Sequence, residues 1–300
     1  MNKKINFNHS LVFFNLCIIL SAIEYLKSSN LNLICLFLIL SIGISHGSLD
    51  NLKGKKLLKI YKIKSVFLFY MAYIFLSLLI ILFWLLFPQF LLMIFLLVAS
   101  YHFGKEDSDF IIDKKIPINQ LIYFLKGLVV IIAPLLFHKK ETLEIFGYLN
   151  LNILESILVE NDILIFFLFA SLVSSFLISD KKSFELKSIL IMDFISILMI
   201  NYFLSPILAF TVYFCFLHSI RHSISLIFEL NSNFNLGLKE FIRKAIPLTL
   251  LTVLAYLFSL LFLNNYYSLD EAIYKVIFIG LASLTFPHIL LEYLIEKNEK

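Results

Sequence analysis

The stretch VFLFYMAYIFLSLLIILFWLLF occupies residues 66–87 and contains 22 consecutive residues without a charged side chain. A helix needs about 20 apolar residues to cross the hydrocarbon core of a bilayer. The apolar residues run continuously instead of alternating with polar ones, which favours a helix over a strand of a membrane barrel. The stretch therefore predicts a membrane-spanning helix.

Nine further apolar stretches accompany this one. They lie at residues 11–26, 31–47, 89–104, 119–137, 161–179, 189–204, 206–228, 245–263 and 271–295. Hydrophobic residues make up 60% of the 300 residues and charged residues 15%, against roughly 45–50% and about 25% in soluble domains. This composition excludes a water-soluble globule. We expect an all-α fold, a polytopic transmembrane helical bundle of about ten spans, with residues 1–300 forming a single integral membrane domain.

The basic residues support this number of spans. When the segments between spans are numbered alternately from the N-terminus, one set carries 19 of the 25 Lys and Arg residues and the other carries 4. Cytoplasmic loops carry such an excess, so the pattern predicts a multi-pass protein of the cell membrane with both termini cytoplasmic. The net charge of +4 is too small to indicate a nucleic-acid partner.

Histidines fall at one depth of the predicted bundle. Five of the seven histidines lie in or at the end of even-numbered spans, late in each: His46, His102, His218, His222 and His288. Even-numbered spans run toward the cytoplasm, so all five belong to the cytoplasmic part of the membrane. Ionisable groups at membrane depth are costly and usually functional, which makes this set a candidate site.

These histidines are candidate ligands of a metal ion. In HSIRH, residues 218–222, the two histidines are four residues apart and share one helix face. Two imidazoles in this arrangement can chelate one metal ion. Imidazole suits iron, zinc, copper and nickel, so the ligand types alone leave the metal undecided.

A histidine, a glycine and then an acid recur at two helix ends. GISHGSLD, residues 43–50, places Asp50 one turn beyond His46, and SYHFGKED, residues 100–107, places Glu106 and Asp107 about a turn beyond His102. A carboxylate can orient a ligating imidazole through its second nitrogen. The spacing predicts that role for Asp50 and Asp107, with solvated loop charge as the alternative.

Other polar and aromatic residues complete the candidate site. His288 is a further ligand, an outer hydrogen-bond partner or a substrate-pocket residue. Arg221 needs an anion, and Asp193 lies at compatible depth, so we expect a structural ion pair. Five aromatic residues flank the candidate ligands and are expected beside them or in a substrate pocket: Tyr101, Phe103, Tyr213, Phe214 and Phe216.

Four segments together resemble the Brp/Blh family of membrane beta-carotene dioxygenases. They are GISHGSLD, SYHFGKED, YFCFLHSIRH (residues 213–222) and GLASLTFPH (residues 280–288), and they occur in the family's order. The resemblance covers residues 40–295, and residues 1–30 would be an extra first span. It implies an oxidoreductase that cleaves the central double bond of beta-carotene with O2, giving two all-trans-retinal for a rhodopsin.

The resemblance also implies a cofactor and its ligands. The family is held to use non-haem iron, Fe(2+), and the matching histidines are His46, His102, His218 and His222. His288 matches a family histidine whose role stays open, and Asp107 is the acid nearest the family pattern, with Glu106 extra. A polyene substrate would enter an intramembrane site from the lipid bilayer, and flanking aromatics would stabilise a cationic intermediate.

Two other functions stay open at this point. A desaturase or hydroxylase also uses HxxxH, although the HxxHH boxes usual in that class are absent from the chain. A proton-coupled carrier would predict broken helices and polar residues on both sides of the midplane, whereas the histidines gather on one side.

Overall fold

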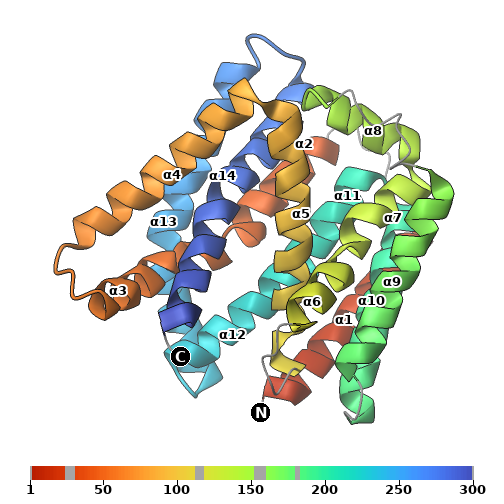
Figure 1. The fold of residues 1–300 in the computed structure, drawn as a ribbon, viewed down its shortest axis with the longest axis horizontal. Coiled ribbons are helices and arrows are strands. Elements are labelled where there is room, and N and C mark those ends of the chain that lie inside the picture. The colour runs from red at the N-terminus through yellow and green to blue at the C-terminus, as the bar shows by residue number, and fades with distance from the viewer. Residues whose placement is uncertain (1, 24–30, 112–117, 152–159, 180–182, 299–300) are drawn as a thin grey trace.

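The computed structural model describes residues 2–23, 31–111, 118–151, 160–179 and 183–298, and every regular element in these ranges is a helix. Within this part of the chain, nine helices are long and apolar enough to cross a membrane. A further helix, α5, stands among them and coincides with the stretch predicted at 89–104 (Figure 1). The prediction of an all-α helical bundle with about ten spans is confirmed.

Several predicted spans consist of shorter helical pieces. The α-helices are α1 (Asn2–Ala22), α2 (Leu31–Leu38), α3 (Asp50–Ile60), α4 (Val66–Leu86), α5 (Pro88–Glu106), α6 (Ile118–Gly127), α7 (Val129–Phe137), α8 (Lys139–Tyr148), α9 (Asn161–Ser179), α10 (Phe184–Phe203), α11 (Pro206–Val212), α12 (Ile220–Leu230), α13 (Phe234–Leu263) and α14 (Leu269–Asn298). The π-helical segments η1 (Ile39–Gly43) and η5 (Tyr213–Ser219) and the 3₁₀ segments η2 (His46–Leu49) and η3 (Asp109–Ile111) connect or extend them. Short π-helical segments occur frequently at functional sites.

The first helix begins earlier than its apolar stretch indicates. The sequence predicts a span at 11–26, whereas α1 covers Asn2–Ala22, and residues 24–30 lie outside the described part of the chain. Asn6 and Ser10, in the polar early turns, are buried. The helix therefore extends toward the N-terminus because protein contacts, besides lipid, stabilise it; α1 packs along α10.

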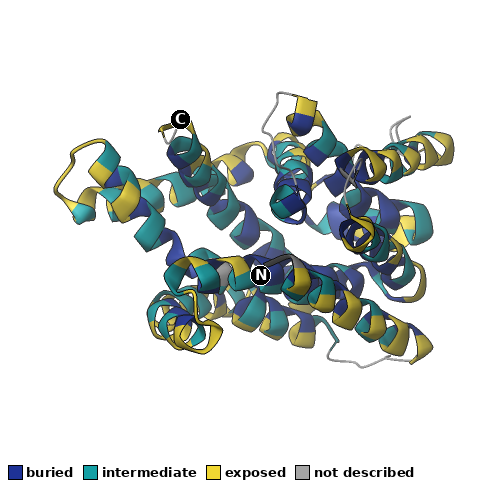
Figure 2. Cartoon of the chain, turned by 90° about the horizontal axis from the view of Figure 1, so that it is seen from below, coloured by how far each residue is buried: buried dark blue, intermediate teal, exposed yellow. Residues whose placement is uncertain are grey.

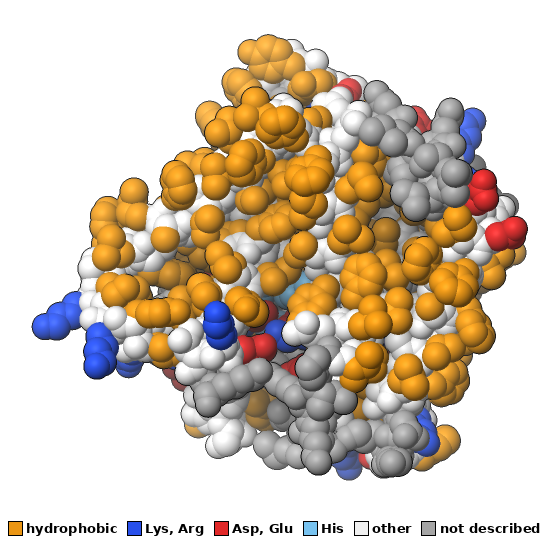
Figure 3. All heavy atoms as spheres, in the orientation of Figure 1, with side chains coloured by type: hydrophobic (Ala, Val, Ile, Leu, Met, Phe, Trp, Pro, Cys, Tyr) orange, Lys and Arg blue, Asp and Glu red, His pale blue; other side chains and the backbone are white. Residues whose placement is uncertain are grey.

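The outer and central helices differ sharply in burial. In the most apolar stretch of α4, 0% of the residues are buried, and in that of α13, 11% are buried. In the run α11–η5–α12 the buried share is 72%. Buried residues line the inward faces of the helices (Figure 2). Apolar side chains cover most of the face in Figure 3, and most of its basic side chains lie in the lower half. Such an apolar outer surface fits lipid as the surrounding solvent. The central run carries His218 and His222.

Helices α5 and α6 cross at backbone contact. Added methyl groups would overlap backbone carbonyl oxygens of the partner helix: a methyl on Gly104 would overlap Tyr123, and one on Gly127 would overlap Ser100. Small residues allow this close approach between membrane helices. Gly104 lies two residues after His102, so this crossing sets where α5 presents that histidine.

Replacement of Gly127 tests the crossing. We expect Gly127→Ala to destabilise the protein by about 3 kcal/mol, the upper end of typical overpacking costs, because backbone has to move. Thermal unfolding in detergent measures this loss. Gly147→Ala in α8 is the matched control, since its methyl group would meet no atom within 4 Å, and alanine is the better helix former. Equal losses of stability in the two variants would contradict the close crossing.

Candidate metal centre

Four histidines from three spans meet at one buried place. The ring centroids of His102 (α5) and His218 (η5) are 5.2 Å apart, and those of His102 and His288 (α14) are 5.3 Å apart. The ring of His222 (α12) lies 5.9 Å from that of His288. All four side chains are buried. The structure thus brings together four of the five histidines that the sequence singled out.

The fifth, His46, opens η2 in the same part of the bundle. Its side chain lies outside what the structure describes. The segment itself is anchored near the other histidines, because η1, which precedes it, contacts η5. Ser219, next to His218, donates a hydrogen bond of 2.9 Å from Oγ to the carbonyl oxygen of Gly43.

Each of three histidines has its own carboxylate at Nδ1. His218 Nδ1 lies 3.2 Å from Asp107 Oδ1, and His222 Nδ1 lies 2.6 Å from Glu106 Oε2. His288 Nδ1 lies 2.8 and 2.9 Å from the two oxygens of Asp50. An imidazole that donates its Nδ1–H to a carboxylate is fixed in orientation and presents Nε2 as its metal-binding atom. Glu106, which is extra to the family pattern in the sequence, therefore has a histidine partner as Asp107 does.

Two tyrosines hold these carboxylates in turn. Tyr213 donates from its hydroxyl to Asp107 Oδ2 at 2.7 Å, and Tyr73 donates to Asp50 Oδ2 at 2.8 Å. Tyr73 lies on α4 and was not identified from the sequence. Little in the sequence indicates its role, because the position of one tyrosine among the aromatic residues of a lipid-facing helix does not show which way its side chain points.

Arg221 forms the expected ion pair with Asp193. Its NH1 lies 2.7 Å from Asp193 Oδ2, and its NH2 lies 3.2 Å from Asp193 Oδ1. NH1 also donates to the backbone oxygen of Asp107 at 3.3 Å, and NH2 donates to Ser10 Oγ at 2.6 Å. This guanidinium connects α12 to α10, to the end of α5 and to α1.

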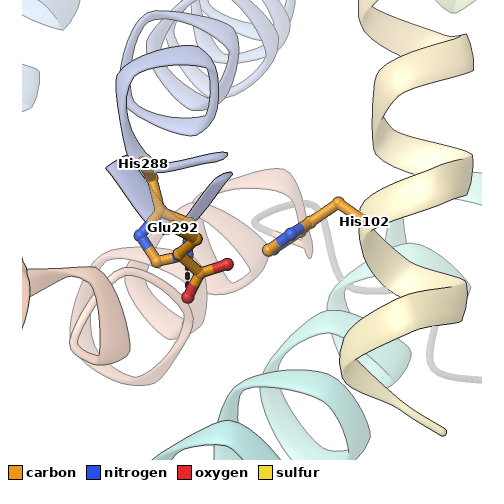
Figure 4. A group of neighbouring side chains, drawn as sticks. All are labelled: His102, His288 and Glu292. Carbon is orange, nitrogen blue, oxygen red and sulfur yellow. Dashed lines mark ion pairs between the residues drawn. The ribbon is translucent and has the colours of Figure 1, made fainter. Parts of the chain in front are cut away.

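Among the described residues, histidine and glutamate side chains form two groups that can bind a metal. In each group the donor atoms lie within 4.8 Å of one another: His102, His288 and Glu292 in one, and Glu106, His222 and Glu292 in the other. Figure 4 shows the imidazole of His102 on α5 pointing toward His288 and Glu292 on α14. Buried imidazole and carboxylate donors fit a first-row divalent metal ion.

Glu292 was missed in the sequence. It lies four residues after His288 and so shares a helix face with it. The spacing was visible, but an acid near the end of a span is as typical of a solvated cytoplasmic charge. In the structure its Oε1 lies 3.5 Å from His288 Nε2 and 2.5 Å from Lys53 Nζ.

A cavity of 730 Å³ adjoins the histidines. His102, His288 and Asp50 line it together with Phe103 and Phe214, and most of the remaining wall is apolar. The Phe103 ring also lies 4.9 Å from the ring of His218. The volume of the cavity lies within the range of about 300–1,000 Å³ usual for small-molecule sites.

The cavity reaches the apolar flank of the bundle. Leu78 and Leu85 on α4 and Phe258 on α13 line it, yet they are 59%, 72% and 74% exposed. They therefore belong to the cavity wall and to the outer surface at once. An apolar molecule dissolved in surrounding lipid can reach the histidines without crossing water.

Two of the aromatic residues singled out in the sequence point elsewhere. Tyr101 packs edge-on against Tyr123 of α6, with ring centroids 6.3 Å apart. Phe216 offers its backbone oxygen to His9 at 2.8 Å. Neither ring is among the described residues that line the cavity. Successive residues of a helix point about 100° apart, so adjacency to a ligand in sequence does not bring both neighbours to it.

Comparison with known proteins agrees with this arrangement. A curated relative from the uncultured marine bacterium 66A03, named beta-carotene 15,15'-dioxygenase, is 29% identical over 263 residues, covering 85% of this chain and 90% of the relative. No solved structure matches the chain. The profile of the beta-carotene 15,15'-dioxygenase family matches residues 37–296, a range that includes the four converging histidines, Glu292 and His46. The chain belongs to the beta-carotene 15,15'-dioxygenase family, whose members are carotenoid-cleaving oxidoreductases.

Proposed function

We propose that this protein is an iron-dependent intramembrane dioxygenase that cleaves the central double bond of beta-carotene with O2 and yields two all-trans-retinal. The observation that carries the proposal is the meeting of two environments. His102 and His288 belong both to a buried histidine cluster and to the wall of an apolar cavity that reaches the lipid-facing flank. A metal enzyme for a lipid-soluble polyene needs this combination.

The cavity suits a long, rigid and apolar substrate. Its wall is built from side chains of α4, α7, α13 and α14 and offers few polar partners away from the histidine end. A polyene has no hydrogen-bonding groups, so it gives up no hydrogen bonds on entering this cavity. It would move into the cavity laterally from the bilayer. The rigid chain would lie along the helices, with one double bond beside His102.

The chain's own residues would hold and orient the metal. We assign His46, His102, His218 and His222 as ligands of Fe(2+), and Asp107 and Glu106 as the carboxylates that orient His218 and His222. When bound, the iron supplies the activation of O2, which protein side chains cannot perform. Phe103 and Phe214 exclude water beside His218 and offer ring faces to positive charge that develops on the polyene.

The remaining partners follow from the same proposal. Beta-carotene and O2 are the substrates, the lipid bilayer is the surrounding solvent, and retinal is passed to a rhodopsin. The distribution of basic residues favours the cell membrane, with both termini in the cytoplasm. In Figure 1, α1 begins and α14 ends at the same end of the bundle, as an even number of spans requires.

Carotenoid analysis of whole cells tests the function. In cells that make beta-carotene, expression of the protein should remove the orange pigment and accumulate retinal in about a 1:2 molar ratio of pigment lost to retinal formed, because central cleavage gives two identical products. Extraction and chromatography measure both compounds. Unchanged pigment in cells that contain well-folded protein would favour a carrier instead, and a hydroxylated carotenoid would favour a hydroxylase.

Removal of a proposed ligand tests the metal assignment. His218→Ala or His222→Ala should weaken iron retention by more than about 100-fold, beyond the usual cost of losing an outer hydrogen-bond partner, and should abolish retinal formation. Iron per chain is measured in purified protein, with size-exclusion chromatography as the check of folding. His138→Ala is the matched control, since His138 lies between α7 and α8 and outside the histidine cluster.

The iron content of the unmodified protein adds a second comparison. One iron per chain supports the dioxygenase, whereas two would support a desaturase-like centre and none a carrier. Full iron content in either histidine variant would remove that histidine from the ligand set.

A further inference from the structure

We propose that Glu292 is a carboxylate ligand of the metal centre, in addition to the histidines. This inference rests on the proposed function, because it adds a donor to the same site. Glu292 is the residue that the two potential metal-binding groups share. His102 and His288 belong to one group and Glu106 and His222 to the other, so Glu292 is the residue that joins the two groups.

The position of Glu292 is built and not incidental. Its side chain is 11% exposed, and its Oε1 contacts Lys53 Nζ at 2.5 Å. Lys53 belongs to α3, which begins at Asp50 directly after η2, the segment that carries His46. The ion pair holds one oxygen of the carboxylate in place. Burial of a carboxylate costs free energy unless charge and hydrogen bonds compensate it. Glu292 carries this cost, which an acid on the surface would not.

The charges around the site call for a divalent cation. Four largely buried carboxylates surround it: Asp50, Glu106, Asp107 and Glu292. Two basic side chains act on them: Lys53 pairs with Glu292, and the buried Lys126 attracts Asp107. Asp193 and Arg221 balance each other. Lys105 pairs separately with Glu296 at 2.8 Å. With neutral imidazoles, the described residues leave an excess of two negative charges, which one divalent ion balances.

The roles of the carboxylates separate by geometry. Asp50, Glu106 and Asp107 each engage a histidine at Nδ1 and so serve as outer partners. Glu292 instead lies beside Nε2 of His288, at 3.5 Å, the atom that an Nδ1-bonded imidazole presents to a metal. Glu292 thus lies on the metal-facing side of the His288 ring, which is the place of a ligand and not of an outer partner.

Metal binding by Glu292→Gln tests the proposal. The variant keeps the size of the side chain but removes its charge, and we expect it to retain Fe(2+) or Co(2+) at least about tenfold more weakly. The absorption bands of bound Co(2+) should also shift, because an oxygen donor is lost. Glu296→Gln is the matched control, since Glu296 lies one turn further along α14 and pairs with Lys105.

The outcomes separate this inference from the proposed function. Metal retention and Co(2+) bands equal to those of the unmodified protein would overturn the role of Glu292 alone. An unmodified protein that binds no metal would overturn the proposed function as well. If Glu292→Gln does not fold, Glu292→Asp decides: a shifted spectrum in this shorter carboxylate supports ligation, and an unchanged spectrum contradicts it.

A separate observation concerns α1, which lies outside the matched residues 37–296. His9 donates from Nε2 to the backbone oxygen of Phe216 at 2.8 Å, and Ser10 accepts from Arg221 at 2.6 Å. Phe216 precedes His218 by two residues in η5, and Arg221 also donates to the backbone oxygen of Asp107, the partner of His218. We infer that α1 positions His218 and belongs to the catalytic unit, in place of the extra span expected from the sequence.

The double variant His9→Leu/Ser10→Ala tests this role of α1. We expect metal retention to fall roughly tenfold, as for loss of other outer partners, with altered Co(2+) bands, while the protein remains folded. Asn15→Ala is the control on the same helix, because Asn15 is exposed and bonds only within α1 to Leu11. The variant His9→Leu/Ser10→Thr, which keeps a hydroxyl at position 10, should lose less metal than His9→Leu/Ser10→Ala.

A folded double variant with unchanged metal retention and spectrum would show that α1 only anchors the bundle. If the double variant fails to fold, Ser10→Ala alone is compared with Ser10→Thr in the same assay, and equal metal retention in these two would overturn the inference.

Discussion

The burial of ionised groups inside an apolar helix bundle is the constraint on which the rest of this structure depends. Moving a lone charge out of water costs several kcal/mol even after the protein relaxes, so each charge needs a close partner. Arg221 meets Asp193 in a two-point contact, and Lys53 meets Glu292. Each of these pairs joins two helices, and the bundle cannot rearrange there without leaving a charge unpaired.

The same partners bring the histidines to one depth. Asp107 and Glu106, consecutive at the end of α5, engage His218 and His222, which are one turn apart on the central run. The close crossing of α5 and α6 at Gly104 and Gly127 fixes the depth of α5 against its neighbour. A carboxylate that must reach a histidine and a backbone that must pass another backbone therefore act together on the position of His102.

The polar cluster and the apolar cavity divide the interior between them. The histidines and carboxylates occupy one end, and the cavity extends from His102 and His288 toward the exposed residues of α4 and α13. Both helices bury little of their surface, so their packing leaves room for an apolar guest. A lipid-soluble molecule and a charged cluster can share this interior because few polar side chains line the cavity away from the histidines.

The sequence by itself determined the class of fold and the approximate number of spans, because apolar length is a local property of the chain, and it singled out the histidines. It also placed Arg221 near Asp193. Only the tertiary structure decided which side chains meet. Glu292, Tyr73 and Glu106 acquired partners, the described rings that line the cavity do not include Tyr101 and Phe216, and α1 contacts the central run through His9 and Ser10. These outcomes depend on the rotation of each helix about its axis. Contacts between different helices set this rotation, and no local pattern of the sequence records it.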